Sequence, residues 1–156
     1  MPLPLMMETD AFQDGGIVPP RFGCFGDNVQ PGFKFKNVPE HAGSLALILH
    51  DLDVALDGST EDGLHWTVWN IPPDEVVPEG RLPQGAVLGR NVENRNAYLG
   101  PSAPPDSRYH HYVFELFALD RELDLPPSAG RAELLAAMDG NVIGKAAYVG
   151  RFRRPS

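Results

Sequence analysis

The chain has 156 residues, the usual length of one domain, and its hydrophobic fraction of 42% is enough to form a core, which argues against wholesale disorder. With 21 acidic residues against 13 Lys and Arg, the formal net charge of −8 disfavours nucleic acid and anionic membrane surfaces as partners. Cys24 is the only cysteine, which excludes an intramolecular disulfide and a zinc site built on several thiolates. Without a leader-like or membrane-spanning pattern, the sequence predicts one cytoplasmic domain over residues 1–156.

Short apolar runs separated by turn residues predict a protein built mainly of strands. Sixteen Gly and sixteen Pro, without a low-complexity run, indicate many tight turns. In chain order the pattern predicts an edge strand, a half-buried strand, three strongly apolar strands and a weaker last strand, at residues 17–20, 33–36, 45–49, 65–71, 112–119 and 146–152.

One helix is expected, at residues 131–138. Its residues are strong helix formers, Gly130 can serve as the N-cap, and Gly140 suits the C-terminal stop. The side of this helix that faces the core would carry Leu134, Leu135 and Met138. Strands scattered along the chain, with one late helix, favour a mainly antiparallel β fold, most simply a two-sheet sandwich with Greek-key links.

Histidines and aspartates gather where the apolar runs begin or end. The groups concerned are His50, Asp51, Asp53, His65, His110 and His111. A stiff, proline-rich loop at residues 100–105 lies between them in sequence. We interpret these stretches as the rim of one polar pocket at one end of the β structure, suited to a small anion.

Each of these signals also has a structural interpretation. Asp51 and Asp53 face the same way on an extended chain, where they could bind a cation, orient a histidine or simply form an acidic turn. His65 could equally be a core histidine that donates to a backbone carbonyl. His110 and His111 point to opposite sides of a strand, so one of them can face the pocket, and the pattern leaves open which.

Two further features favour purely structural roles. Arg151, Arg153 and Arg154 form the only basic cluster, and we interpret it as a solvated tail. Cys24 is expected to be a buried small hydrophobe rather than a reactive thiol.

Five motifs appear in order between about Phe12 and Arg154. They are an Asp-x-Asp segment at 51–53, a histidine with an aromatic strand at 65–72, a Gly-Pro-rich loop at 97–105, a His-x-Tyr with Phe-Ala-Leu-Asp at 110–120, and an Ala-Met-x-Gly segment before a closing Gly-x-Phe-x-Arg at 137–154. Together they resemble the phosphatidylethanolamine-binding protein family, also called Raf kinase inhibitor proteins, and most closely its short bacterial and archaeal branch. The chain departs from the family pattern at Leu52, His111 and Asn141, where the family has Pro, Arg and His.

This resemblance implies a mainly β fold with a large antiparallel sheet packed on a smaller sheet and one or two short helices. It implies a binding site for phosphate or a phospholipid head group, formed by Asp51, Asp53, His65, Pro104, Pro105, His110 and Tyr112. It further implies, for some members, regulation of kinases or proteases, and it makes a homodimer plausible. We assign no catalytic residue, metal ligand or cofactor.

An anion beside Asp51 requires this carboxylate to be protonated or paired with a cation. We expect Asp51 to accept a hydrogen bond from His65 or His110, which raises the pKa of that histidine and lets the imidazolium donate to the anion. The alternatives are a metal-dependent hydrolase that uses the same His and Asp groups, although their spacing matches no metal motif, and an interaction module whose pocket has lost its ligand.

Overall fold

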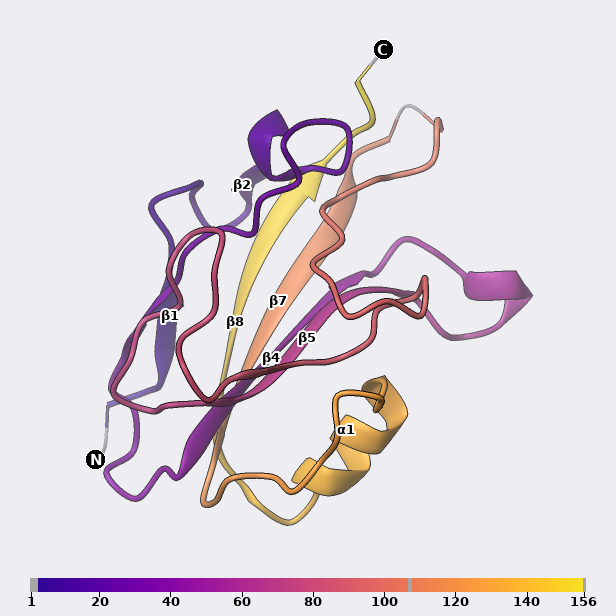
Figure 1. The fold of residues 1–156 in the computed structure, drawn as a ribbon. Helices are drawn as coiled ribbons and strands as arrows, with labels where there is room; N and C mark the ends of the chain where they lie inside the picture. Colours follow the sequence, from indigo (N-terminus) through magenta and orange to yellow (C-terminus); the bar gives the residue numbers. More distant parts are fainter. Residues whose placement is uncertain (1–2, 107, 156) are drawn as a thin grey trace.

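The computed structural model describes residues 3–106 and 108–155, and its strands form two sheets (Figure 1). The strands are β1 Met6–Glu8, β2 Gly16–Ile17, β3 Lys34–Lys36, β4 Ser44–Asp51, β5 Gly63–Ile71, β6 Val87–Leu88, β7 His110–Leu119 and β8 Val142–Phe152. The helix α1 spans Arg131–Met138, and two 3₁₀ turns, η1 and η2, span Pro20–Phe22 and Leu56–Gly58. The large sheet has the order β2, β8, β7, β4, β5, β6, and the small sheet pairs β1 with β3, which confirms the mainly β fold.

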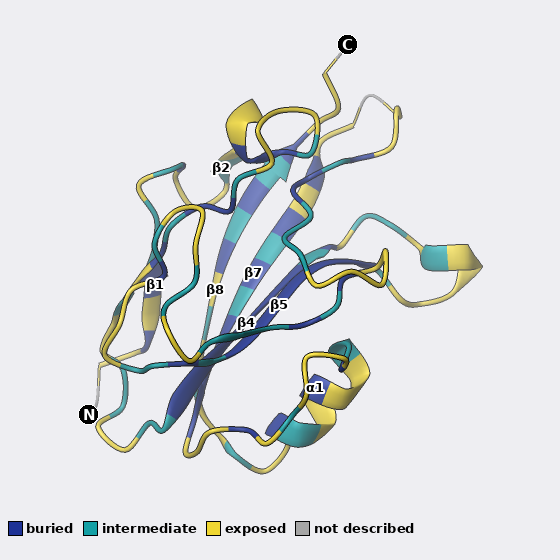
Figure 2. Cartoon of the chain, viewed as in Figure 1, coloured by how far each residue is buried: buried dark blue, intermediate teal, exposed yellow. Residues whose placement is uncertain are grey.

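Strand β4 lies in the middle of the large sheet, and both of its faces are buried, as its continuous apolar run predicts (Figure 2). Leu45, Leu47 and Leu49 contribute to one hydrophobic core, and Ala46 and Ile48 contribute to a second core on the opposite face. This alternation follows from the two-residue period of a strand. The sheet therefore separates two hydrophobic layers.

The two layers are covered by different elements. The small sheet lies over the first layer, to which it contributes Met7 and Phe35. Helix α1 covers the second layer through Leu134 and Met138. Among the described residues, no helix has the length and apolarity that crossing a bilayer requires.

The bounds predicted for α1 are confirmed, whereas part of its predicted core face is wrong. Leu134 and Met138 are buried, but Leu135 is 46% exposed. Leu135 follows Leu134 by one residue, about 100° around the helix, so it lies outside the face that the sheet covers. Cys24, expected to be buried, is partly exposed.

The large sheet is mixed rather than wholly antiparallel. Strand β2 runs parallel to β8, with Gly16 opposite Gly150, whereas the other strand pairs of this sheet are antiparallel. The backbone amide of Val18 donates to the carbonyl of Arg151 at 2.8 Å. The edge strand predicted at residues 17–20 is thus shorter and starts earlier, at Gly16–Ile17, whereas β1 and β6 carry too few residues to produce a clear sequence pattern.

Candidate functional site

The polar residues predicted to form a site gather at one end of the large sheet. Strand β4 ends at Asp51, where its antiparallel neighbours β5 and β7 begin. In the sheet register, Asp51 lies opposite Tyr112 of β7 and opposite Gly63 of β5. The antiparallel pairing of β4 with β7 therefore brings together Asp51 and His110, which are 59 residues apart in sequence.

The centre of this cluster is a chain of two carboxylates and one imidazole. His110 Nδ1 lies 2.8 Å from Asp51 Oδ2, and His110 Nε2 lies 2.9 Å from Asp106 Oδ2. His110 is fully buried and Asp51 is 1% exposed, whereas Asp106 lies at the surface. Burial lowers the pKa of His110, but the hydrogen bonds and charges of Asp106 and Asp51 outweigh burial, so the pKa of this histidine is raised.

The pairing of Asp51 with a histidine, expected from the sequence, is made by His110 and not by His65. Both ring nitrogens of His110 lie against carboxylates, which accept hydrogen bonds and donate none when ionised. With both carboxylates ionised, each ring nitrogen donates a proton, which makes His110 an imidazolium and agrees with its raised pKa. The buried carboxylate of Asp51 is thus neutralised by a cation at hydrogen-bond distance.

His65 is buried nearby in a different protonation state. Its Nδ1 donates to the carbonyl of Leu99 at 2.8 Å, with the carbonyl of Gly100 at 3.2 Å. Burial lowers the pKa of His65, so the ring is neutral with its proton on Nδ1. In this tautomer Nε2 is an acceptor and cannot donate to an anion. Of the two histidines that the sequence offered as partners of Asp51, His65 is therefore not the one with a raised pKa, and its carbonyl contacts fit the core-histidine interpretation.

Tyr112 fixes the proline-rich loop above the cluster. Its hydroxyl oxygen accepts hydrogen bonds from the backbone amides of Ser102 at 3.2 Å and Ala103 at 2.9 Å, and its ring meets the ring of His65 edge-on at 5.2 Å. Burial and the nearby charge of Asp51 raise the pKa of Tyr112, so the phenol keeps its proton.

The same loop is anchored at its start by Gly100. The Gly100 amide donates to the side chain of Asn28 at 2.7 Å. A Cβ at this position would lie 2.2 Å from the Phe22 carbonyl oxygen, so the close approach of the two backbones requires glycine. Further along, Pro104 and Pro105 are exposed.

Asp53 lies beside the cluster but binds the neighbouring histidine. Its Oδ2 accepts from the backbone amide of His111 at 2.7 Å and lies 2.9 Å from His111 Nδ1. Burial raises the pKa of Asp53, but the hydrogen bonds from His111 have a larger opposite effect, so the pKa of this carboxyl is lowered overall. The side chain of His111 is 52% exposed, which answers the question left open by the sequence: His110 faces the site and His111 faces solvent.

One metal-binding geometry also exists here. Asp51, Asp53 and His110 each have a potential ligand atom, and these atoms all lie within 4.8 Å of one another. Asp51 and His110 are, however, hydrogen-bonded to each other, and a metal ion would have to replace that contact if it used the same two atoms.

His50, read from the sequence as part of the same rim, lies on the opposite face. Its Nδ1 is 2.6 Å from Asp62 Oδ2, and its Nε2 is 2.7 Å from Glu115 Oε1. Arg131, the first residue of α1, also donates to Asp62 at 2.5 Å. His50 therefore belongs to a contact between the sheet and the helix. The sequence indicated this, because His50 directly precedes Asp51 on a strand and neighbouring side chains of a strand point to opposite faces.

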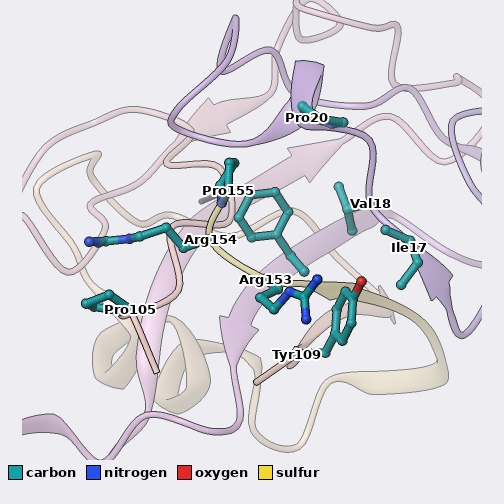
Figure 3. A pocket seen from close by; sticks show the side chains of 9 residues that line it. Ile17, Val18, Pro20, Pro105, Tyr109, Arg153, Arg154 and Pro155 are labelled. Atoms are coloured by element: carbon teal, nitrogen blue, oxygen red, sulfur yellow. The ribbon is translucent and has the colours of Figure 1, made fainter. Parts of the chain in front are cut away.

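A hollow of about 720 Å³, which the sequence did not predict, is lined by residues that include Pro105, Tyr109 and Phe152 (Figure 3). Figure 3 shows the side chain of Arg153 beside Tyr109 at its rim. The guanidinium of Arg153 lies 4.8 Å from the centre of the Tyr109 ring, and Arg154 Nε donates to the Ala103 carbonyl at 3.0 Å. These arginines are thus held against aromatic rings and backbone rather than extending as a solvated tail.

Comparison with known proteins places the chain among its relatives. The sequence profile of phosphatidylethanolamine-binding protein matches residues 8–153. The UPF0098 protein of Methanothermobacter thermautotrophicus is 44% identical over 154 residues, which cover 95% of this chain and 98% of that protein. The chain therefore belongs to the phosphatidylethanolamine-binding protein family, in the bacterial and archaeal branch that the motifs indicated.

Solved structures agree with this assignment. A Chlamydia trachomatis homolog of phosphatidylethanolamine-binding protein has a TM-score of 0.89 at 31% identity, over 97% of this chain and 99% of that chain. Escherichia coli YbcL has a TM-score of 0.87 at 27% identity, over 98% of this chain and 100% of that chain. The carboxypeptidase Y inhibitor, solved with its cognate proteinase, shares the fold at a TM-score of 0.57 and 13% identity, over 97% of this chain and 84% of that chain.

Proposed function

We propose that this protein binds a small phosphate-like anion at the end of the large sheet, with His110 as the principal donor. The observation that carries the proposal is the contact of 2.9 Å between His110 Nε2 and the carboxylate of Asp106. In this contact a buried imidazolium presents an N–H group to an oxyanion at the surface. Phosphate oxygens accept hydrogen bonds with the same geometry.

The surrounding charges support an anion at this position. Asp51, the buried carboxylate, is already neutralised by His110, and Asp53 is engaged by His111. Arg108 lies nearby, with its guanidinium 3.5 Å from Asp106 and 3.9 Å from Asp53. An anion that contacts His110 would therefore meet two cations, whereas the carboxylates around it are hydrogen-bonded.

The same proposal includes which phosphate-containing molecule binds and which proteins are partners. Free phosphate and a phospholipid head group such as phosphoethanolamine present the same oxygens to His110. Regulation of a kinase or a protease, a homodimer and a cytoplasmic location stay proposals. The carboxypeptidase Y inhibitor motivates the protease role, but at 13% identity it shares only the fold with this chain.

An NMR titration of the five histidine side chains tests the proposal directly. Phosphate and O-phosphoethanolamine would be added at pH 6.5 with a chelator present. We expect saturable shifts of the His110 ring signals, and the exposed His41 provides the internal control. His110→Gln should abolish saturable binding. If His110 does not respond to either compound, this site does not bind phosphate-like anions.

A metal-dependent hydrolase is the second candidate, and the close approach of ligand atoms from Asp51, Asp53 and His110 favours it. Zinc or manganese would then bind in a one-to-one ratio and support hydrolysis of a phosphate ester. Metal analysis after dialysis against each ion, with Asp53→Asn as the variant, separates the two functions. Stoichiometric metal that Asp53→Asn removes would favour the hydrolase.

A further inference from the structure

The environment of Asp106 extends the proposed anion site, and the inference drawn from it rests on that proposed function. Asp106 follows the two prolines of the loop, and its side chain is 34% exposed. One carboxylate oxygen lies on His110 Nε2, and the other accepts from the backbone amide of Arg108 at 3.0 Å. The carboxylate thus covers the outward N–H of an otherwise buried imidazolium.

The two carboxylates that contact His110 differ in how easily they could leave. Asp51 is 1% exposed, lies in the sheet and also accepts from the backbone amide of Asp53 at 2.8 Å. Asp106 lies in an exposed loop, and rotation of its side chain would place the carboxylate in water. Losing Asp51 would leave a buried cation without its partner, whereas losing Asp106 opens one N–H group to solvent.

We infer that Asp106 is an internal ligand of the anion site, which an external oxyanion must displace from His110 before it binds. Because Asp106 is attached to the same chain, it competes at an effective concentration of about millimolar or above. An external carboxylate offers His110 no more than Asp106 already provides. A phosphoryl group has more acceptor oxygens and, as the dianion, more charge, so it can contact His110 and the guanidinium of Arg108 together.

Asp106 is therefore the residue that sets both affinity and specificity in this site. The charged groups that face it are His110 from β7, Arg108 from its own loop, and Asp51 and Asp53 from the end of β4. With Asp106 in place, the site excludes singly charged carboxylates. Without the charge of Asp106, the site should no longer discriminate against singly charged carboxylates.

The test compares phosphate and acetate binding in the wild type and in Asp106→Asn at pH 6.5, followed at the His110 ring. Asparagine keeps the acceptor for the Arg108 amide and so preserves the loop. We expect phosphate to bind Asp106→Asn about tenfold more tightly than the wild type, and acetate to bind only the variant. Asp74→Asn, at an exposed turn, is the matched control for net charge and should behave as the wild type.

The possible results distinguish this inference from the proposed function. Equal phosphate affinity in the wild type and Asp106→Asn would overturn the competition by Asp106 and leave the anion site intact. Phosphate binding to neither protein would overturn the anion site itself, and the inference with it. Asp106→Ser, checked for a native spectrum, repeats the comparison with a shorter side chain.

Discussion

His50 and Asp51 are consecutive residues of β4, and their side chains lie on opposite faces of the large sheet, where each takes part in a chain of two carboxylates and an imidazole. On one face Asp51 and Asp106 flank His110, and on the other Asp62 and Glu115 flank His50. The first chain opens to solvent through Asp106. The second joins the sheet to α1 through Arg131, which gives it a structural role, whereas the first is the proposed anion site.

Asp51→Asn should lower the free energy of unfolding by about 3 kcal/mol, because it leaves the buried imidazolium of His110 with one carboxylate instead of two. Urea unfolding at pH 7 measures this change. Asp74→Asn removes the same charge from an exposed turn and should change stability by less than about 0.5 kcal/mol. Equal effects of the two substitutions would show that the Asp51–His110 pair contributes nothing specific.

His65 and His110 should differ in protonation at pH 6.5. The pKa of His65 is lowered by burial, whereas the pKa of His110 is raised by its two carboxylates in spite of burial. Ring ¹⁵N shifts should therefore report a neutral His65 with its proton on Nδ1 and a doubly protonated His110. A neutral His110 at this pH would remove the basis for the proposed donor.

Sulfate binding should depend on pH through His110. Sulfate remains a dianion from pH 5.5 to pH 8.5, so changes in affinity report on the protein. Because the pKa of His110 in the folded chain lies above the unperturbed value of about 6.5, affinity should persist through neutral pH and fall as pH rises past the raised pKa. Calorimetric titration across this pH range measures the affinity for sulfate. An affinity that does not change with pH contradicts an imidazolium donor.

His50 should stabilise the protein at low rather than high pH. Burial lowers its pKa, but the hydrogen bonds and charges of Glu115 and Asp62 outweigh burial and raise it. A raised folded pKa gives stability that is fully present below the unfolded value of about 6.5 and is lost as pH rises through the folded value. The contact also includes Arg131 on Asp62 and Lys145 near Glu115.

The substitution His50→Gln reports this contribution. The difference in unfolding free energy between the wild type and His50→Gln should be largest at pH 6 and should shrink by pH 9. Urea unfolding at both pH values gives the comparison, and His41→Gln at an exposed position is the control. A difference that grows with pH would reverse the sign expected from the two carboxylates.

Tyr112→Phe should loosen the loop over the site. The substitution removes the acceptor of the amides of Ser102 and Ala103, and an unpaired buried donor costs about 1–3 kcal/mol. Hydrogen exchange at these two amides should become faster. Tyr109→Phe, which keeps an exposed ring three residues earlier, should leave their exchange unchanged.

Much of this fold could be predicted because strong local patterns decide it. The run at residues 45–49 has no polar side chain, and α1 combines strong helix formers with a glycine on each side, so both appear where expected. The parallel pairing of β2 with β8 could not be predicted, because it joins a strand of two residues to one that is far away in sequence. No local periodicity encodes such a partner.

The site was predictable in its residue types but not in its contacts. The positions of Asp51 and His110 at strand ends brought them together, whereas Asp106 looks like any exposed loop aspartate in sequence. The assignment of His50 to the same rim could have been avoided, since neighbouring residues of a strand point to opposite faces. The contacts of Arg153 and Arg154 with aromatic rings could not be predicted, because their partners, Tyr109 and Phe25, are distant in sequence.

The parallel pairing of β2 with β8 has a consequence for how the chain is made. Gly16 and its partner Gly150 are far apart in sequence, so all of the chain between them must leave the ribosome before this edge of the sheet can close. Contacts of such long separation form slowly. During synthesis the early segment therefore waits without its partner, and the hollow beside Phe152 comes into being only with the last residues of the chain.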